Sequence, residues 1–253
     1  MRTRLLAAAT AAALAILAFT GATAQANHSW GGYHWARTAN PFTLQVMDNV
    51  SGVWDTHLNT AISDWSQSTV LDLTKVAGSG NAKSCRPVAG RIKACNALYG
   101  NTDWLGIASI WITGGTHITQ GTTKVNDTWF NTPTYNTTAW RNLVMCQEIA
   151  HDFGLDHQDE NFENPNLGTC MDYTDDPSTN QHPNRHDYDQ LVTIYSHLDS
   201  TSTIGSTTAF AAEVGNDRAS WGRLVGGSAS HGHGLYVRDF GRGNMVITHV
   251  IWA

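Results

Sequence analysis

Four side chains in the middle of the chain have the types and the spacing of a metal site with an adjoining base: Gln147, Glu148, His151 and His157. On a helix the first three share one face, because residues three and four apart are neighbours there. Gly154 suits a chain that leaves the helix with a positive φ, and such a turn would bring His157 back toward His151. Two imidazoles that converge beside a carboxylate predict a zinc ion, with the carboxylate as general base.

The spacing of this stretch is that of the metzincin signature, in which a zinc-binding helix, a glycine and a further histidine are followed by a Met-turn. Downstream, the run Thr169-Cys170-Met171-Asp172-Tyr173 supplies a Met-turn. The chain therefore resembles the metzincin clan of zinc endopeptidases, and within it the matrixin-like secreted forms of bacteria. It departs from the signature at Gln147, which stands where the first ligand histidine would be.

The resemblance implies a fold and a set of roles. The fold would be α+β and zincin-like, with a twisted mixed sheet, two long helices and a smaller, mostly irregular lower part. Zinc would be held by Gln147, His151 and His157, and Glu148 would take a proton from water and pass it to the leaving amine. Met171 would form an apolar floor, and Tyr173 would help to stabilise the oxyanion.

The glutamine leaves three alternatives open, because a carboxamide oxygen is a weaker zinc ligand than an imidazole. Gln147 binds the metal through its oxygen, another group such as Asp159 or Tyr173 completes the ligand set, or the site is inactive. An inactive site would leave a secreted homologue that binds peptides or proteins without cleaving them. We expect a zinc endopeptidase, since a carboxylate buried beside two histidines is costly unless it has a use.

The first 26 residues have the pattern of a secretory signal, with a basic start, an apolar run and the small-residue cleavage site Ala24-Gln25-Ala26. The apolar run is shorter than the ~20 residues of a membrane-spanning helix. We therefore expect a secreted, extracellular protein. A net charge of −6 without a Lys/Arg cluster argues against nucleic acid and anionic membranes as partners. The expected partner is a peptide or protein substrate, and the expected state is a monomer.

The chain contains an even number of cysteines, four, which in an exported protein favours disulfides. Of the three pairings that four cysteines allow, we favour Cys85–Cys95 with Cys146–Cys170. The first closes a short loop. The second would join the helix of Glu148 to the Met-turn. A cysteine metal site is the less favoured alternative, because the chain has no C-x-x-C pair.

Hydrophobic periodicity predicts the elements around the site. We expect strands at 42–46, 70–76, 92–98, 105–113 and 117–125, and helices at 51–68, at 139–153 and around 188–198. In metzincins an antiparallel edge strand pairs with the substrate, and one of the strands 105–113 and 117–125 is expected to be that edge. We expect His117, which opens the second of them, to be exposed and not a metal ligand.

We divide the chain into a signal peptide (1–26), a catalytic domain (27–200) and a C-terminal β extension (201–253). A Ser/Thr/Gly linker at 200–208 separates the last two, and strand-like runs follow at 221–225, 234–240 and 245–252. The acidic, Asn-rich segment 156–166 has enough oxygen ligands for a calcium ion, but no EF-hand pattern.

Overall fold

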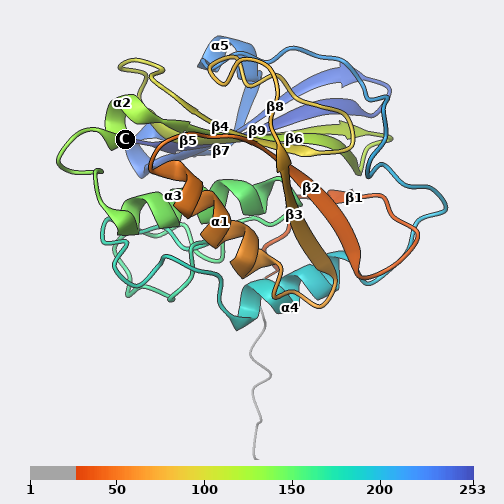
Figure 1. The fold of residues 1–253 in the computed structure, drawn as a ribbon, viewed down its shortest axis with the longest axis horizontal. Helices are drawn as coiled ribbons and strands as arrows, with labels where there is room; N and C mark the ends of the chain where they lie inside the picture. The colour runs from red at the N-terminus through yellow and green to blue at the C-terminus, as the bar shows by residue number, and fades with distance from the viewer. Residues whose placement is uncertain (1–26) are drawn as a thin grey trace, which may run out of the picture.

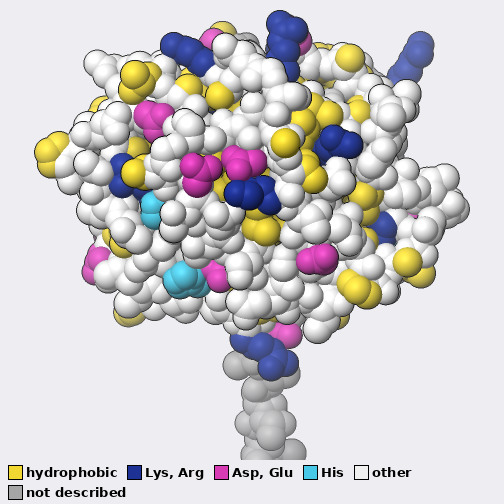
Figure 2. Space-filling model, in the orientation of Figure 1, with side chains coloured by type: hydrophobic (Ala, Val, Ile, Leu, Met, Phe, Trp, Pro, Cys, Tyr) yellow, Lys and Arg dark blue, Asp and Glu magenta, His cyan; other side chains and the backbone are white. Residues whose placement is uncertain are grey.

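The computed structural model describes residues 27–253, so the predicted secretory signal lies outside the described residues. These residues form an α+β fold around one twisted mixed sheet (Figure 1). In the view of Figure 2, Lys and Arg side chains are scattered over a mostly uncharged surface, which agrees with a charged fraction of 14%.

The strands of the sheet lie in the order β3-β2-β4-β6-β5-β9-β8-β7. Their bounds are β2 (Phe42–Asn49), β3 (Leu71–Ala77), β4 (Ile92–Ala97), β5 (Trp104–Thr113), β6 (His117–Asn126), β7 (Arg223–Ser228), β8 (His233–Gly241) and β9 (Asn244–Trp252). The short β1 (His34–Trp35) pairs with the start of β6. Strands β3, β2, β4 and β6 are parallel, and every pairing from β6 through β5, β9 and β8 to β7 is antiparallel.

Helices α1 (Trp54–Trp65) and α3 (Thr138–His151) lie side by side against one face of the sheet, and α4 (Arg185–Ile194) lies below them (Figure 1). Helix α3 starts where the Thr137 side chain accepts a hydrogen bond from the backbone N–H of Trp140. The short helices α2 (Asp127–Phe130) and α5 (Arg218–Trp221) and a 3₁₀ turn, η1 (Ala229–His231), lie in connections. Among residues 27–253, none of the helices has the length and apolarity that crossing a membrane requires.

Strand β5 does not form an open edge, because β9 pairs with it from Trp104↔Trp252 to Ile112↔Met245. The expectation that strand 105–113 or strand 117–125 borders an open cleft is therefore wrong. The physical reason lies in β9, which is apolar on both faces and so requires cover on both. Ile247 and Ile251 face the main core under the helices, whereas Val250 belongs to a smaller core on the opposite face.

The C-terminal extension predicted at 201–253 supplies three strands of this same sheet. Both favoured disulfides, Cys85–Cys95 and Cys146–Cys170, are present. The second joins α3 to the residue before Met171. The indole N–H of Trp65 also donates to the carbonyl oxygen of Cys146 at 3.0 Å, which ties α1 to the same turn of α3.

Candidate metal centre

The end of α3 is built as the sequence predicts. Gly154 has a φ of +96°, and a Cβ at this position would lie 2.1 Å from the carbonyl oxygen of Tyr33. Only glycine combines this conformation with so close an approach. The chain then turns back, and Nδ1 of His151 lies 2.8 Å from the carbonyl oxygen of Leu155. This turn brings His157 beside His151, with ring centroids 4.7 Å apart.

A third histidine joins these two from the C-terminal strand. His249 pairs with Ala108 across the β5–β9 ladder. Its ring centroid lies 4.1 Å from that of His151 and 4.4 Å from that of His157. One nitrogen from each of the three rings falls within 4.8 Å of the other two. We call these three residues the buried group, because their exposed fractions are 0%, 6% and 1%.

Two rings of the buried group, those of His151 and His249, each make a hydrogen bond through one nitrogen and leave the other nitrogen unpaired. The carbonyl oxygen of Leu155 holds Nδ1 of His151, and the Tyr173 hydroxyl holds Nε2 of His249 at 2.9 Å. Nδ1 of His157 faces the carboxylate of Glu160 at 3.6 Å. Nε2 of His151, Nδ1 of His249 and both ring nitrogens of His157 are buried without a hydrogen-bond partner. Metal-binding imidazoles in proteins are oriented in this way, so the residues fit a zinc ion.

The charges at the site agree with this assignment. Burial lowers the pKa of His151 and of His249 well below its ordinary value, and the neighbouring imidazoles add to the effect. Both rings are therefore neutral, which is the form that binds a metal ion. Burial, followed by the nearby charge of Asp152, raises the pKa of Glu148 well above its ordinary value. Both carboxylate oxygens of Glu148 are buried without a hydrogen-bond partner, which is costly unless a cation or water completes the site.

Gly106 on β5 has no side chain, and this leaves room for Glu148 between α3 and the sheet. A Cβ at Gly106 would lie 2.6 Å from one carboxylate oxygen of Glu148 and 2.7 Å from Val144. On the other side of the site, the indole ring of Trp30 stacks on His151, with centroids 4.7 Å apart and planes 3° from parallel. The buried group therefore has an aromatic wall from the N-terminal segment.

Gln147 directly precedes Glu148 on α3. Its amide is buried, with neither the oxygen nor the nitrogen hydrogen-bonded, and it lines a pocket of about 220 Å³. Tyr173 lines the same pocket, together with apolar side chains that include Leu105, Trp140 and Trp252. Gln147 thus borders space that a ligand could fill.

Asp159 was also considered as a third zinc ligand, but its carboxylate makes hydrogen bonds to other residues. Its carboxylate accepts hydrogen bonds from the backbone N–H of Asn161 and from the side chain of Asn164. These contacts shape the acidic loop that follows His157. A calcium ion in this loop stays a prediction.

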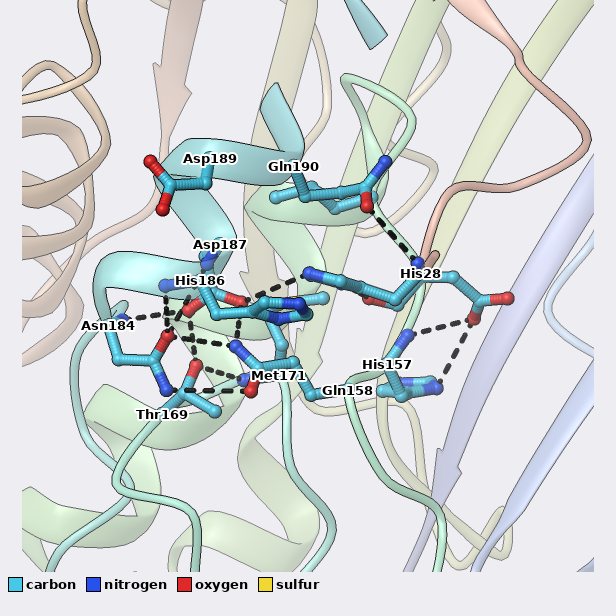
Figure 3. Close-up of polar contacts among 12 residues, drawn as sticks. His28, His157, Gln158, Thr169, Met171, Asn184, His186, Asp187, Asp189 and Gln190 are labelled. Atoms are coloured by element: carbon cyan, nitrogen blue, oxygen red, sulfur yellow. Dashed lines mark hydrogen bonds and ion pairs between the residues drawn. The ribbon is translucent and has the colours of Figure 1, made fainter. Parts of the chain in front are cut away.

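Met171 is fully buried, and its carbonyl oxygen accepts a hydrogen bond from the backbone N–H of Gln158 at 2.6 Å. The side chain of Gln158 donates to Asp187, whose other carboxylate oxygen accepts from the Thr169 hydroxyl (Figure 3). Asp187 also closes the capping box at the start of α4. One buried carboxylate thus fixes the Met-turn and the residue after His157 to a single helix end.

His249 is the residue of the buried group that sequence analysis missed. A signal for it exists within the strand run 245–252. Alternation places His249 on the same face as Ile247 and Ile251, and that face packs toward the helices. A lone imidazole on the core face of an apolar strand requires a partner, but the sequence alone does not show that β9 lies beside α3.

No family model and no curated protein sequence matches the chain. Among solved structures, it is similar to high choriolytic enzyme 1, a hatching enzyme zinc-protease from the medaka fish Oryzias latipes. The two share 10% sequence identity over 64% of this chain and 94% of the other, with a TM-score of 0.35. A likeness this weak supports no inference about the fold or the activity of this chain.

Proposed function

We propose that the protein is a secreted, metzincin-like zinc endopeptidase whose metal is held by His151, His157 and His249. The observation that carries the proposal is the convergence of three buried imidazoles, each with an unpaired ring nitrogen, at the end of the helix that carries the unpaired carboxyl group of Glu148. The helix-and-turn spacing of the sequence supports peptide hydrolysis as the reaction. His249 takes the ligand place that the metzincin signature gives to residue 147.

The three histidines, Glu148 and Tyr173 have different roles in this proposal. Zinc bound by the three rings would polarise the scissile carbonyl and lower the pKa of water. Glu148 accepts the proton of the attacking water and delivers it to the leaving amine. Tyr173, whose hydroxyl is committed to His249, acts as a positioning residue that holds this ligand in its tautomer.

We further propose that the pocket beside Gln147 receives a side chain of the substrate. Its walls are mainly aromatic and aliphatic, which favours an apolar side chain. The unpaired amide of Gln147 can both donate to and accept from a peptide group. In this proposal Gln147 serves substrate binding and not metal binding.

One observation favours a second candidate function. Strand β9 occupies the side of β5 along which a peptide would add as a strand, and the buried group is closed to solvent. Zinc would then serve to fasten β9 to α3, in a homologue that does not cleave peptides. In both candidate functions the same residues bind the same metal. The functions differ in whether water and substrate reach Glu148.

Metal analysis combined with a cleavage assay tests both. We expect cleavage of a mixed peptide library that stops when a chelator removes zinc. We also expect His249→Ala to lose both cleavage and the zinc of the buried group. Gln147→Met, a change of similar size without a ligand oxygen, is the matched control and should keep its zinc.

Three outcomes decide between the candidates. Zinc content that is unchanged in His249→Ala but reduced in Gln147→Met would overturn the ligand assignment. Zinc-loaded protein that cleaves nothing in the library would reject the peptidase and support the non-cleaving homologue. Cleavage that survives complete removal of zinc would reject both.

A further inference from the structure

A second group of histidines lies where three distant segments meet. His34 lies on β1 and pairs in register with His117, the first residue of β6. His197 and Asp199 follow α4, and the backbone N–H of Asp199 donates to the carbonyl oxygen of Arg37 at 2.9 Å. Backbone pairing therefore fixes the segments that carry these side chains.

The donor atoms of three of these residues have the separations of a shared coordination shell. Nε2 of His34 and Nε2 of His197 are 3.1 Å apart, and they lie 3.5 Å and 3.8 Å from Oδ1 of Asp199. A tetrahedral zinc ion with bonds of about 2.0–2.1 Å keeps its donor atoms about 3.3–3.4 Å apart. The three measured distances lie around that value. We call His34, His197 and Asp199 the open group.

Two of these ligands are oriented through atoms that a metal would not use. Nδ1 of His34 lies 2.8 Å from the carbonyl oxygen of Gly32, which leaves Nε2 directed at the group. Oδ2 of Asp199 accepts from the backbone N–H and the guanidinium of Arg37, both at 3.1 Å, and Oδ1 is left to face the rings. A ligand set held from outside in this way is typical of metal sites.

His117 is adjacent to the open group but is not one of its ligands. Its Nε2 lies 3.2 Å from Oδ1 of Asp199, yet it falls outside the set whose donor atoms all lie within 4.8 Å of one another. We assign it as a hydrogen-bond donor to Asp199. The side chains of His197 and His117 are 49% and 33% exposed, so water can take the fourth position.

We propose that the open group binds a second divalent ion of the zinc class. Two imidazoles and a carboxylate are a common zinc ligand set. The ion would fasten the N-terminal segment to the segment after α4. The N-terminal segment also carries Trp30, which stacks on His151, so the second ion would support one wall of the buried group. This inference stands whether or not the buried group is catalytic.

Elemental analysis of the purified protein tests the proposal after equilibration with excess zinc and removal of the unbound metal. We expect two equivalents of zinc per chain, and one equivalent in His197→Ala and in His249→Ala. The control is His182→Ala, which removes another exposed imidazole next to a carboxylate, at 2.7 Å from Asp64, and should keep both equivalents. Crystals measured at the zinc absorption edge should show an anomalous peak between His34, His197 and Asp199.

A different zinc content would contradict the proposal. One equivalent of zinc in the unchanged protein and in His197→Ala, without an anomalous peak at the open group, would overturn the proposal. The 3.1 Å approach of the two rings would then be a hydrogen bond between the two imidazoles. The crystallographic arm does not depend on any variant folding correctly.

Discussion

The buried group and the open group both bring imidazoles together, but they differ in burial and in charge. The buried group offers three imidazoles that are at most 6% exposed, and Glu148, on the same helix as His151, has both oxygens unpaired. The open group includes its own carboxylate, faces solvent through His197, and its carboxylate is already paired with Arg37. Converging imidazoles are thus common to both groups. An unpaired base and an adjoining pocket belong to the buried group.

This difference predicts that metal binding at the two groups has different effects. Metal in the buried group should govern cleavage, whereas metal in the open group should govern stability. The three tests below compare the two effects, and they are ordered from the largest expected change to the smallest.

The largest effect is expected from Glu148→Gln. The amide has the size of the carboxylate but cannot accept a proton, so kcat for peptide cleavage should fall by about 10²–10⁴-fold. Zinc content should stay at two equivalents, because Glu148 is not a ligand in either group. Steady-state cleavage and elemental analysis measure the two quantities. Glu163→Gln, on the exposed acidic loop, is the control, and an unchanged kcat in Glu148→Gln would remove Glu148 from the mechanism.

A smaller and more selective effect is expected from Tyr173→Phe, which deletes the hydroxyl that holds Nε2 of His249. Loss of such an outer contact should weaken zinc binding at the buried group by about 10–100-fold and leave the open group unchanged. Competition with a chromophoric chelator measures both affinities.

The same variant separates two roles for the hydroxyl. If Tyr173 only positions His249, kcat should recover to near its original value once zinc is saturating. If the hydroxyl stabilises the oxyanion directly, kcat should stay about 10²–10³-fold lower at any zinc concentration.

The sequence predicts local structure well because its signals are local. The predicted helix at 51–68 spans Trp54–Trp65, and the one at 139–153 spans Thr138–His151. The positive φ of Gly154 and both disulfides were also predicted correctly. Each follows from periodicity, from a residue type with one special property, or from short separations along the chain.

The third histidine could not be predicted in the same way. Strand β9 was predicted, but its place next to β5 depends on pairing between segments far apart in the sequence. Periodicity does not encode this pairing, although an apolar pattern on both faces argues against an edge strand. The open group is hidden for the same reason, since His34 and His197 are each a lone histidine until the fold joins them.

The smallest effect in this series is expected from His197→Ala, measured as thermal stability. A ligand present at 100 times its Kd stabilises the folded state by about 2.7 kcal/mol. For a chain of this size each kcal/mol shifts Tm by roughly 2–4 °C, so the variant should melt about 5–10 °C below the unchanged protein in excess zinc. In the presence of a chelator that removes zinc only from the open group, the variant and the unchanged protein should have the same Tm. The reason is that the exposed side chain of His197 itself contributes little to stability. His182→Ala should melt with the unchanged protein under both conditions. A difference in Tm that persists without zinc would assign the loss to packing around His34, and the open group would then differ from the buried group in lacking a metal altogether.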